Sequence, residues 1–131
     1  MLKKKIKRSF DSELEKLIVV TNFLNNKKLQ NFDKLCALSI KAISKGNKII
    51  FFGNGGSAAD SLHLATELKV KYKKKRKALN AIALSADTAS ITAIANDFNF
   101  KYIFARQLEA AGKPGDVAIA LTTSGNSKNL I

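Results

Sequence analysis

The chain has 131 residues, enough for one small domain with a hydrophobic core. Its hydrophobic fraction of 46% is ordinary for a globular protein and excludes a disordered chain. No stretch approaches the roughly 18 consecutive apolar residues of a membrane helix, so we predict no membrane partner. The basic start, MLKKKIKRSF, is not followed by the apolar region and small-residue cleavage site of a signal peptide. A cytoplasmic protein is therefore expected.

The net charge of +13 is concentrated in two places. Five basic residues fall in the first eight positions, and seven fall between Lys69 and Lys77 in the run KVKYKKKRK. No zinc-finger spacing, aromatic RNA-binding motif or clear helix-turn-helix accompanies either run. Because an anionic substrate would explain the charge equally well, we do not expect nucleic acid as a partner. The second run is predicted to be a solvated helix end and connection.

Two helices are predicted at the start of the chain. Between Phe10 and Leu24 the apolar residues fall near one helical face, and acidic residues crowd the first turns, where the helix dipole favours them. Polar residues 25–28 make a break. A second, antiparallel helix is predicted to end near Gly46. Its apolar face is formed by Phe32, Leu35, Cys36, Ile40 and Ile43. The single cysteine, Cys36, is expected to be inert core packing in that face.

Three short apolar runs then predict strands buried on both faces, at residues 48–52, 81–84 and 117–121. Helical segments are predicted between and beside them, at residues 58–71, 88–95 and 102–111. Strand–helix–strand order indicates a parallel sheet with right-handed crossovers. The predicted fold class is α/β, a three-layer αβα sandwich with an open parallel sheet of the flavodoxin or Rossmann type. We expect one domain over residues 1–131, with N-terminal helices at 10–45 and the α/β part at 48–131.

Each predicted strand is followed by a polar turn: GNGGS, SADTAS and TTSGNS. In open α/β sheets, ligands bind at the carboxyl ends of the strands, where these turns converge. The glycines of GNGGSAAD allow backbone N–H groups to approach a ligand, and Ser57 with Asp60 resembles a capping box. Such a helix start attracts anions, phosphate above all, and TTSGNS adds three consecutive hydroxyl groups. We predict phosphate binding here, in preference to two ordinary turns rich in capping residues.

A dinucleotide site is the weaker alternative for the first turn. Residues 53–58 satisfy the pattern G-x-G-x-x-A between a strand and a helix. The acidic residue expected about 20 positions further on is missing, since that region is the lysine-rich run, and Asp87 comes late. A Walker phosphate-binding loop is excluded, because no Lys-Ser or Lys-Thr follows the glycines.

His63 and Glu67 stand four residues apart on the predicted helix behind this turn. At that spacing they project from the same face and can share a metal ion or a substrate proton. For an arbitrary pair, an ordinary surface contact would be the better interpretation. We expect this pair to lie about the length of a short sugar chain from the predicted phosphate site, which favours a functional role. Two ligands alone do not make a metal site.

Taken together, these residues resemble the phosphoheptose isomerase branch of the sugar-isomerase (SIS) domain family. The similarity runs from the N-terminal helices to Ile131. It includes, in matching order, GNGGSAAD, His63, Glu67, AIAL, AIANDF, the GDV before the third strand, and TTSGNS. The resemblance implies an aldose–ketose isomerase that converts sedoheptulose 7-phosphate to D-glycero-D-manno-heptose 7-phosphate through an enediol. This is the first step towards the heptose of lipopolysaccharide and related surface glycans. It also implies a cytoplasmic homotetramer with one zinc ion per subunit and active sites built between subunits.

The resemblance also implies roles for individual residues. Glu67 would be the acid/base that moves a proton between C1 and C2, and it would bind zinc with His63. Thr122 stands where a serine is usual in the family, a change that keeps the hydroxyl. The residues expected to contact substrate are Asn54, Gly55, Gly56, Ser57, Glu67, Asn96, Asp97, Thr122, Thr123, Ser124 and Ser127.

Two further expectations concern the alternatives and the end of the chain. Initiator-associating proteins share this fold and bind a replication initiator, but they generally lack the glutamate, so Glu67 favours the isomerase over a regulatory or sugar-phosphate-sensing protein. The chain stops four residues after Ser127, where a helix is expected to begin. We therefore expect a truncated domain without its last strands, with an unpaired sheet edge. The resemblance implies that the absent segment carries a glutamine and a histidine that complete the zinc site, so the activity of this chain stays open.

Overall fold

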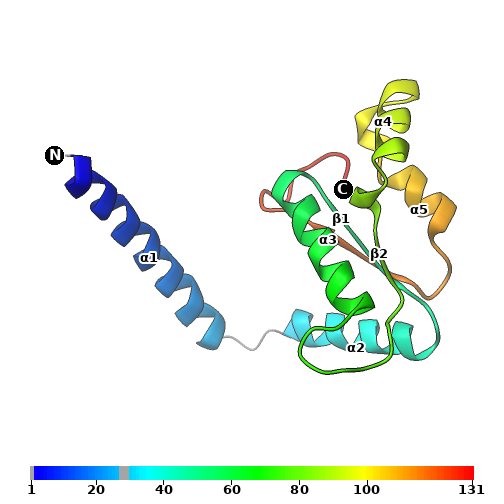
Figure 1. The fold of residues 1–131 in the computed structure, drawn as a ribbon, viewed down its shortest axis with the longest axis horizontal. Helices are drawn as coiled ribbons and strands as arrows, with labels where there is room; N and C mark the ends of the chain where they lie inside the picture. The colour runs from blue at the N-terminus through cyan, green and yellow to red at the C-terminus, as the bar shows by residue number, and fades with distance from the viewer. Residues whose placement is uncertain (1, 27–29) are drawn as a thin grey trace. The chain divides into compact units, whose positions relative to one another are not determined.

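The computed structural model describes residues 2–26 and 30–131. Contacts divide the chain into two compact units, Met1–Cys36 and Ala37–Ile131. Each unit is described by itself below, and the expectation of one domain over residues 1–131 stays a prediction. Helices α1 to α5 and strands β1 and β2 are labelled in Figure 1, and strand β3 lies in the orange part of the ribbon.

The first unit contains helix α1, Leu2–Asn26, and the start of α2, Gln30–Ser44. α1 begins eight residues before the predicted Phe10, because the basic first residues continue the helix. The predicted break at 25–28 falls partly within α1 and partly on residues 27–29, which lie outside the described residues. The antiparallel arrangement of the two helices stays a prediction. Apolar residues of α1 remain exposed, namely Leu2, Ile6, Phe10, Leu14, Leu17, Ile18, Val19, Val20, Phe23 and Leu24.

The apolar face predicted for α2 is only partly buried. Cys36 is half-buried rather than in a core, so its predicted role as core packing is wrong. Phe32 and Ile40 are exposed, whereas Ile43 packs against the core of the second unit. α2 ends as predicted near Gly46, which takes a φ of 81°, a left-handed conformation that favours glycine.

The second unit is built on a parallel sheet of three strands, as predicted. The strands are β1 (Ile49–Gly53), β2 (Ala81–Ala83) and β3 (Val117–Leu121), in the order β2-β1-β3. β1 lies in the middle, with Ile49 opposite Ala81 on one side and Val117 on the other. Every residue of β1 is buried, as its uninterrupted apolar run predicts. The predicted second strand is one residue too long, because Leu84 begins the short 3₁₀ helix Leu84–Ala86.

Helices cover both faces of this sheet, which confirms the predicted three layers. The helices are α3 (Gly55–Lys69), α4 (Thr88–Asp97) and α5 (Ala105–Ala111), with a 3₁₀ turn at Phe100–Tyr102. On one face, Ile49 and Phe51 of β1 pack with α2 and α3 through Ala42 and Ala65. The alternate residues Ile50 and Phe52 face the other side of the sheet. They pack against a cluster that includes Leu84, Ile91, Ile94, Ile103, Phe104 and Leu108.

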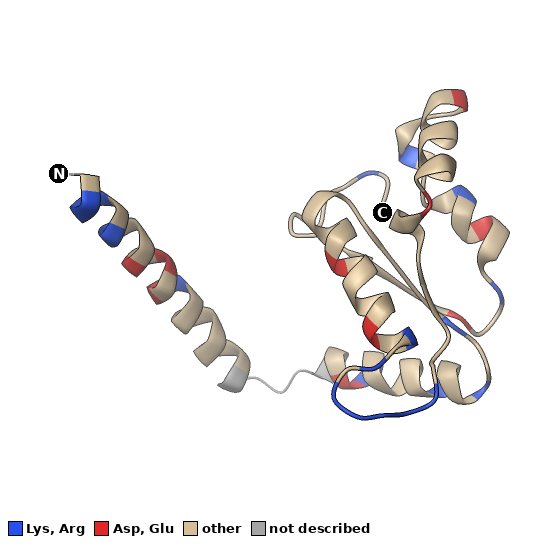
Figure 2. Ribbon diagram, viewed as in Figure 1, with Lys and Arg blue, Asp and Glu red and all other residues tan. Residues whose placement is uncertain are grey.

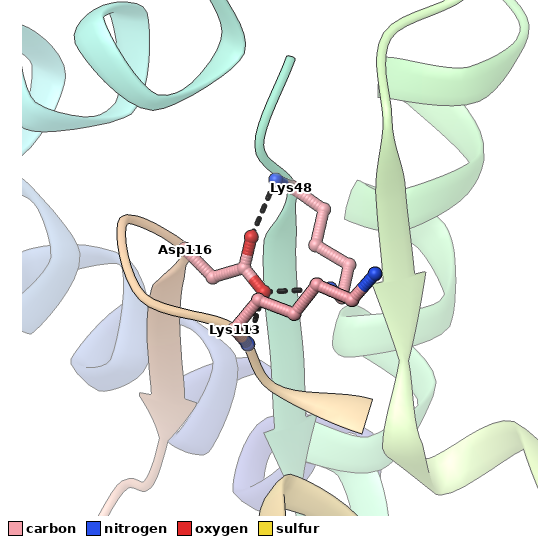
Figure 3. Close-up of polar contacts among 3 residues, drawn as sticks. All are labelled: Lys48, Lys113 and Asp116. Carbon is pink, nitrogen blue, oxygen red and sulfur yellow. Dashed lines mark hydrogen bonds and ion pairs between the residues drawn. The ribbon is translucent and has the colours of Figure 1, made fainter. Parts of the chain in front are cut away.

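A charged cluster joins the amino ends of β1 and β3. The carboxylate of Asp116 accepts hydrogen bonds from the Lys48 backbone N–H at 2.9 Å, the Lys48 ammonium at 2.6 Å and the Lys113 N–H at 2.8 Å (Figure 3). Burial alone would raise the pKa of Asp116, but these hydrogen bonds and the Lys48 charge outweigh it and hold the pKa below its ordinary value. The cluster therefore fixes β3 beside β1 at the end of the sheet away from the polar turns.

The two basic runs lie in different elements (Figure 2). The first run forms the start of α1, and residues 69–77 form the end of α3 and the loop that leads towards β2. Residues 69–77 are exposed throughout, as predicted for a solvated helix end and connection. In the described part of the chain, no helix is long and apolar enough to cross a membrane.

Candidate functional site

Gly53, the last residue of β1, allows two chain segments to meet at the carboxyl end of the sheet. A Cβ atom at Gly53 would lie 2.8 Å from the carbonyl oxygen of Leu121 and 2.8 Å from Cβ of Ser57. No side chain fits in that space, so the end of β3 and the first turn of α3 approach each other only because residue 53 is glycine. This close approach brings the first and third predicted polar turns together.

A small polar cavity lies where these turns meet. It has a volume of about 80 Å³, and Leu121 and Leu130 form the apolar part of its lining. Six of the predicted substrate-binding residues line it: Asn54, Ser57, Thr122, Thr123, Ser124 and Ser127. The structure thus brings together the hydroxyl groups of two segments some 70 positions apart in the sequence. Each of these side chains offers a hydroxyl or amide group suited to an oxyanion.

Backbone hydrogen bonds within the third turn orient its hydroxyl groups. The N–H of Gly125 donates to Oγ1 of Thr122 at 3.2 Å, and the N–H of Asn126 donates to Oγ of Ser124 at 3.2 Å. Each oxygen thereby accepts a bond from the backbone, which leaves its hydroxyl hydrogen available to donate. The expected helix after this turn is not formed among the described residues, where residues 128–130 make a turn.

The start of α3 differs from the predicted capping box. Asn54, not Ser57, is the N-cap, and its side chain makes no capping hydrogen bond within the described part of the chain. The first residue of the helix, Gly55, takes a φ of 53°, a left-handed conformation that favours glycine. The amide of Asn54 instead exchanges two hydrogen bonds of 2.8 Å with the amide of Asn129. The first N–H groups of α3 have no acceptor within the helix and are therefore suited to bind an anion.

Other predicted substrate residues do not line this cavity. Asn96 and Asp97 lie in the last turn of α4, where the Asn96 amide donates to the Asp97 carboxylate at 2.8 Å. Gly55 and Gly56 are exposed in the first turn of α3. Asp87, considered for a dinucleotide site, is the N-cap of α4, and hydrogen bonds from the Ser90 hydroxyl and backbone lower its pKa. Its carboxylate therefore already has a structural partner.

His63 and Glu67 form the predicted pair on α3. Nε2 of His63 lies 3.1 Å from Oε1 of Glu67, and their side chains are 71% and 31% exposed. The second carboxylate oxygen of Glu67, Oε2, is buried and has no hydrogen-bond partner among the described residues. A buried oxygen without a donor is costly, so this atom is suited to receive a proton, a donor group or a cation.

The same pair supplies only part of a metal site. Among the described residues, no group of three or more histidine, cysteine, aspartate or glutamate side chains could hold a metal ion together. Structural and catalytic zinc sites take three or four protein ligands. The pair fits two of those positions, and Oε2 is an available ligand atom.

The expected distance between the pair and the phosphate site stays a prediction, on which the length of α3 bears. Glu67 follows Gly55 by twelve residues in α3, which at ~1.5 Å per residue is about 18 Å along the helix axis. A seven-carbon sugar with its phosphate spans roughly 10–11 Å when extended, since three bonds cover ~3.8 Å in an extended chain. The axial span from Gly55 to Glu67 is therefore longer than the extended substrate, before the length of the Glu67 side chain is subtracted.

The sequence did not predict the structural roles of Asn129 and Ser85. Asn129 is buried and pairs with Asn54, and the Ser85 hydroxyl donates to the carbonyl oxygen of Gly53 at 3.1 Å. Both hydrogen bonds hold residues of the GNGG turn, namely Gly53 and Asn54, in place. No spacing rule relates an asparagine to a partner 75 positions away, so only the fold reveals these contacts.

Parallel strands with a polar cavity at their carboxyl ends define the class of open α/β proteins that bind ligands at this edge of the sheet. The SIS domain family matches residues 14–131, and the chain belongs to that family. Its relatives include phosphoheptose isomerases. One, from Paramagnetospirillum magneticum, is 55% identical over 100 residues, which are 76% of this chain and 52% of that protein. Another, from Campylobacter concisus, is 41% identical over 131 residues, which are 100% of this chain and 67% of that protein.

Solved structures agree with this relationship. The phosphoheptose isomerase from Neisseria gonorrhoeae superposes with a TM-score of 0.86 at 32% identity, over 95% of this chain and 65% of that one. The enzyme from Francisella tularensis gives a TM-score of 0.88 at 31% identity, over 93% and 64% of the two chains. The predicted resemblance and fold class are thereby confirmed. The chain spans between 52% and 67% of the length of the two curated relatives above.

Proposed function

We propose that this protein is an aldose–ketose isomerase that interconverts sedoheptulose 7-phosphate and D-glycero-D-manno-heptose 7-phosphate. The observation that carries the proposal is the polar cavity at the carboxyl ends of β1 and β3, lined by six side chains with hydroxyl or amide groups. The homology to phosphoheptose isomerases supports the same reaction. By that homology the product would serve the synthesis of surface heptose, in the cytoplasm.

The cavity would hold the phosphate end of the substrate. Ser57, Thr123 and Ser127 would donate hydroxyl hydrogen bonds, and the first N–H groups of α3 would add their dipole. Among the residues that the structure describes, no lysine or arginine lines this cavity, so hydroxyl and backbone groups would carry the binding. Thr122 and Ser124, whose oxygens already accept backbone hydrogen bonds, would present their hydroxyl hydrogens to the ligand.

Glu67 would carry the proton transfer. Its carboxylate would remove a proton from C1 of the ketose, and the C2 oxygen would gain a proton to give an enediol. A proton would then return at C2 while the C1 hydroxyl loses its own, which gives the aldose. The buried oxygen Oε2, which has no hydrogen-bond partner within residues 2–26 and 30–131, supports a role in accepting that proton or binding a cation. Asn96 and Asp97 would contact the hydroxyl groups of the sugar.

A zinc ion fits two of the residues present. His63 and Glu67 would hold it, with further ligands from outside the described residues. When bound, zinc would polarise the oxygens of the substrate as a Lewis acid. His63 would also orient the Glu67 carboxylate through the 3.1 Å contact.

The site would be completed between copies of the chain. A sugar phosphate held at one α3 start is about 18 Å from Glu67 of the same helix, so Glu67 of a second copy would act on it. The exposed apolar residues of α1 support association, because apolar surface of this extent marks contact sites. We propose a homotetramer, with the heptose phosphate as its small-molecule partner.

The direct test is an isomerase assay on this chain with sedoheptulose 7-phosphate. We expect Glu67→Gln to lower kcat by at least about 100-fold, the scale of losing a general base. Glu109→Gln is the matched control, since Glu109 is exposed on α5. Full activity of Glu67→Gln would remove the assigned proton transfer. Binding of the sugar phosphate without turnover by the unmodified chain would instead support the regulatory, sugar-phosphate-sensing alternative.

Mixing two inactive variants tests the shared site. Ser127→Asp places a negative charge in the cavity, and Glu67→Gln removes the base, so each alone is expected to be inactive. If the site is shared, the mixture recovers part of the activity, because some sites then receive an intact cavity from one copy and an intact Glu67 from the other. No recovery, with mixed oligomers verified by native mass spectrometry, would contradict a shared site.

A further inference from the structure

The C-terminal end of α3 carries Glu67 but lacks the usual glycine cap. The helix ends at Lys69, and Val70 follows with φ −93° and ψ −85°. The Val70 N–H donates to the Thr66 carbonyl at 2.8 Å, which satisfies one of the last carbonyl groups. The carbonyls of Glu67 and Leu68 lie beyond that bond, and an α-helix supplies no partner for them.

Arg76 supplies the missing donors from the following loop. Its Nη2 donates to the carbonyl oxygen of Glu67 at 2.7 Å, and its Nη1 donates to that of Leu68 at 2.8 Å. Nη1 also donates to the Lys77 carbonyl at 3.1 Å, so the guanidinium binds both the helix and its own loop. The Leu79 N–H closes the same junction by donating to the Leu68 carbonyl at 3.1 Å.

The choice of residue matches this geometry. Arg76 is the one arginine among the seven basic residues of 69–77. A guanidinium group presents several N–H donors in a rigid plane and can bridge adjacent carbonyls, whereas an ammonium group is a point charge on a flexible stem. A positive charge at a helix C-terminus is also favoured by the helix dipole.

We propose that Arg76 is a positioning residue for Glu67. Its guanidinium holds the last turn of α3 in helical form, and that turn fixes the Glu67 carboxylate beside His63, with Oε2 buried. Without the guanidinium, the last turn of α3 frays and the Glu67 carboxylate moves away from His63. The catalytic consequence rests on the proposed isomerase function, whereas the structural consequence does not.

The test compares Arg76→Ala with Arg76→Lys and with Lys75→Ala. Lys75→Ala removes one positive charge from the same loop, so it is the control for charge alone. Amide hydrogen exchange is followed at Val70 and Leu79, whose N–H groups close the end of α3. The ring resonances of His63, the only histidine in the chain, report the position of Glu67. Where the unmodified chain isomerises sedoheptulose 7-phosphate, kcat and KM are measured as well.

In Arg76→Ala we expect exchange at both amides to rise by about tenfold or more, the factor that a hydrogen bond from a charged group supplies. The His63 resonances shift, and kcat falls by about tenfold or more with KM within about twofold, because the base is misplaced while the cavity is intact. Arg76→Lys is intermediate, and Lys75→Ala matches the unmodified chain.

Two results would overturn the proposal. Unchanged exchange and unchanged His63 resonances in Arg76→Ala would remove the structural role. Faster exchange with an unchanged kcat, in a chain that is active, would remove the positioning role. If the unmodified chain is inactive, the proposed function fails, but the exchange rates and the His63 resonances still decide whether Arg76 holds the turn.

Discussion

Replacing Asp116 by asparagine should be one of the most destabilising isosteric changes in the second unit. The carboxylate accepts three hydrogen bonds, two from Lys48 and one from the Lys113 backbone, at 2.6–2.9 Å (Figure 3). An asparagine amide offers one oxygen, so at least one of those donors faces an N–H₂ group instead. The Lys48 ammonium then loses its counter-charge.

The size of the expected loss of stability follows from the burial of the Lys48–Asp116 ion pair. The side chains of Lys48 and Asp116 are 13% and 7% exposed, so the pair lies just beneath the surface. Removing one partner of a deeply buried pair costs about 3–5 kcal/mol. Since asparagine keeps one acceptor and solvent is near, we expect Asp116→Asn to lower the free energy of unfolding by about 2 kcal/mol.

The assay is urea unfolding followed by circular dichroism, at pH 7 and at acid pH. The pKa of Asp116 is lowered in the folded chain, so its stabilisation is present above the ordinary aspartate pKa of about 4 and is lost as the pH falls through the lower, folded value. The difference between the unmodified chain and Asp116→Asn should therefore shrink below about pH 4. Asp60→Asn, at an exposed position on α3, should change the stability by less than about 0.5 kcal/mol at either pH. Equal effects of the two variants at pH 7, or a difference that grows in acid, would refute the reasoning.

Two further changes test the polar end of the sheet. Gly53→Ala should cost about 1–3 kcal/mol in unfolding experiments, because the new Cβ would lie 2.8 Å from the Leu121 carbonyl oxygen and from Ser57; a neutral effect would mean that the two turns part easily. Ser127→Ala should weaken binding of the sugar phosphate by about tenfold in calorimetry, the loss of one hydrogen bond to a charged group, with an unchanged circular dichroism spectrum. Unchanged affinity would place the phosphate elsewhere.

Strands and layers were predictable because they depend on a local pattern. The run from Ile49 to Phe52 is apolar at every position, and only a central parallel strand buries both of its faces. The glycine at position 46 likewise marks the end of α2 without any knowledge of the fold. The convergence of the first and third turns followed from topology alone, since parallel strands end at the same edge.

What the sequence could not supply depends on contacts between distant segments. The capping box was assigned to Ser57 because its spacing from Asp60 fits, yet Gly55 starts the helix earlier and Asn54 pairs with Asn129 instead. The helical face of Cys36 predicted burial, but periodicity does not say whether a partner covers that face. The capping role of Arg76 could not be predicted from the lysine-rich run, because a charge count does not distinguish a guanidinium that caps a helix from solvated lysines beside it.

The two ends of β1 and β3 have different roles, one in the stability of the sheet and the other in the proposed binding of the ligand. At the amino ends of β1 and β3, the ion pair of Lys48 and Asp116 joins the strands, and the pKa of Asp116 is lowered. At the carboxyl ends, neutral hydroxyl and amide groups surround a small cavity. A cavity without its own countercharge binds a phosphate only if its donors are held in place, because each hydroxyl must already point inward when the ligand arrives. The bonds from Gly125 to Thr122 and between Asn54 and Asn129 supply that order without adding charge. The ion pair of Lys48 and Asp116 thus stabilises the sheet at one end, and neutral donors are preorganised at the other. The charges that stabilise the fold therefore lie away from the anion that the cavity is proposed to bind.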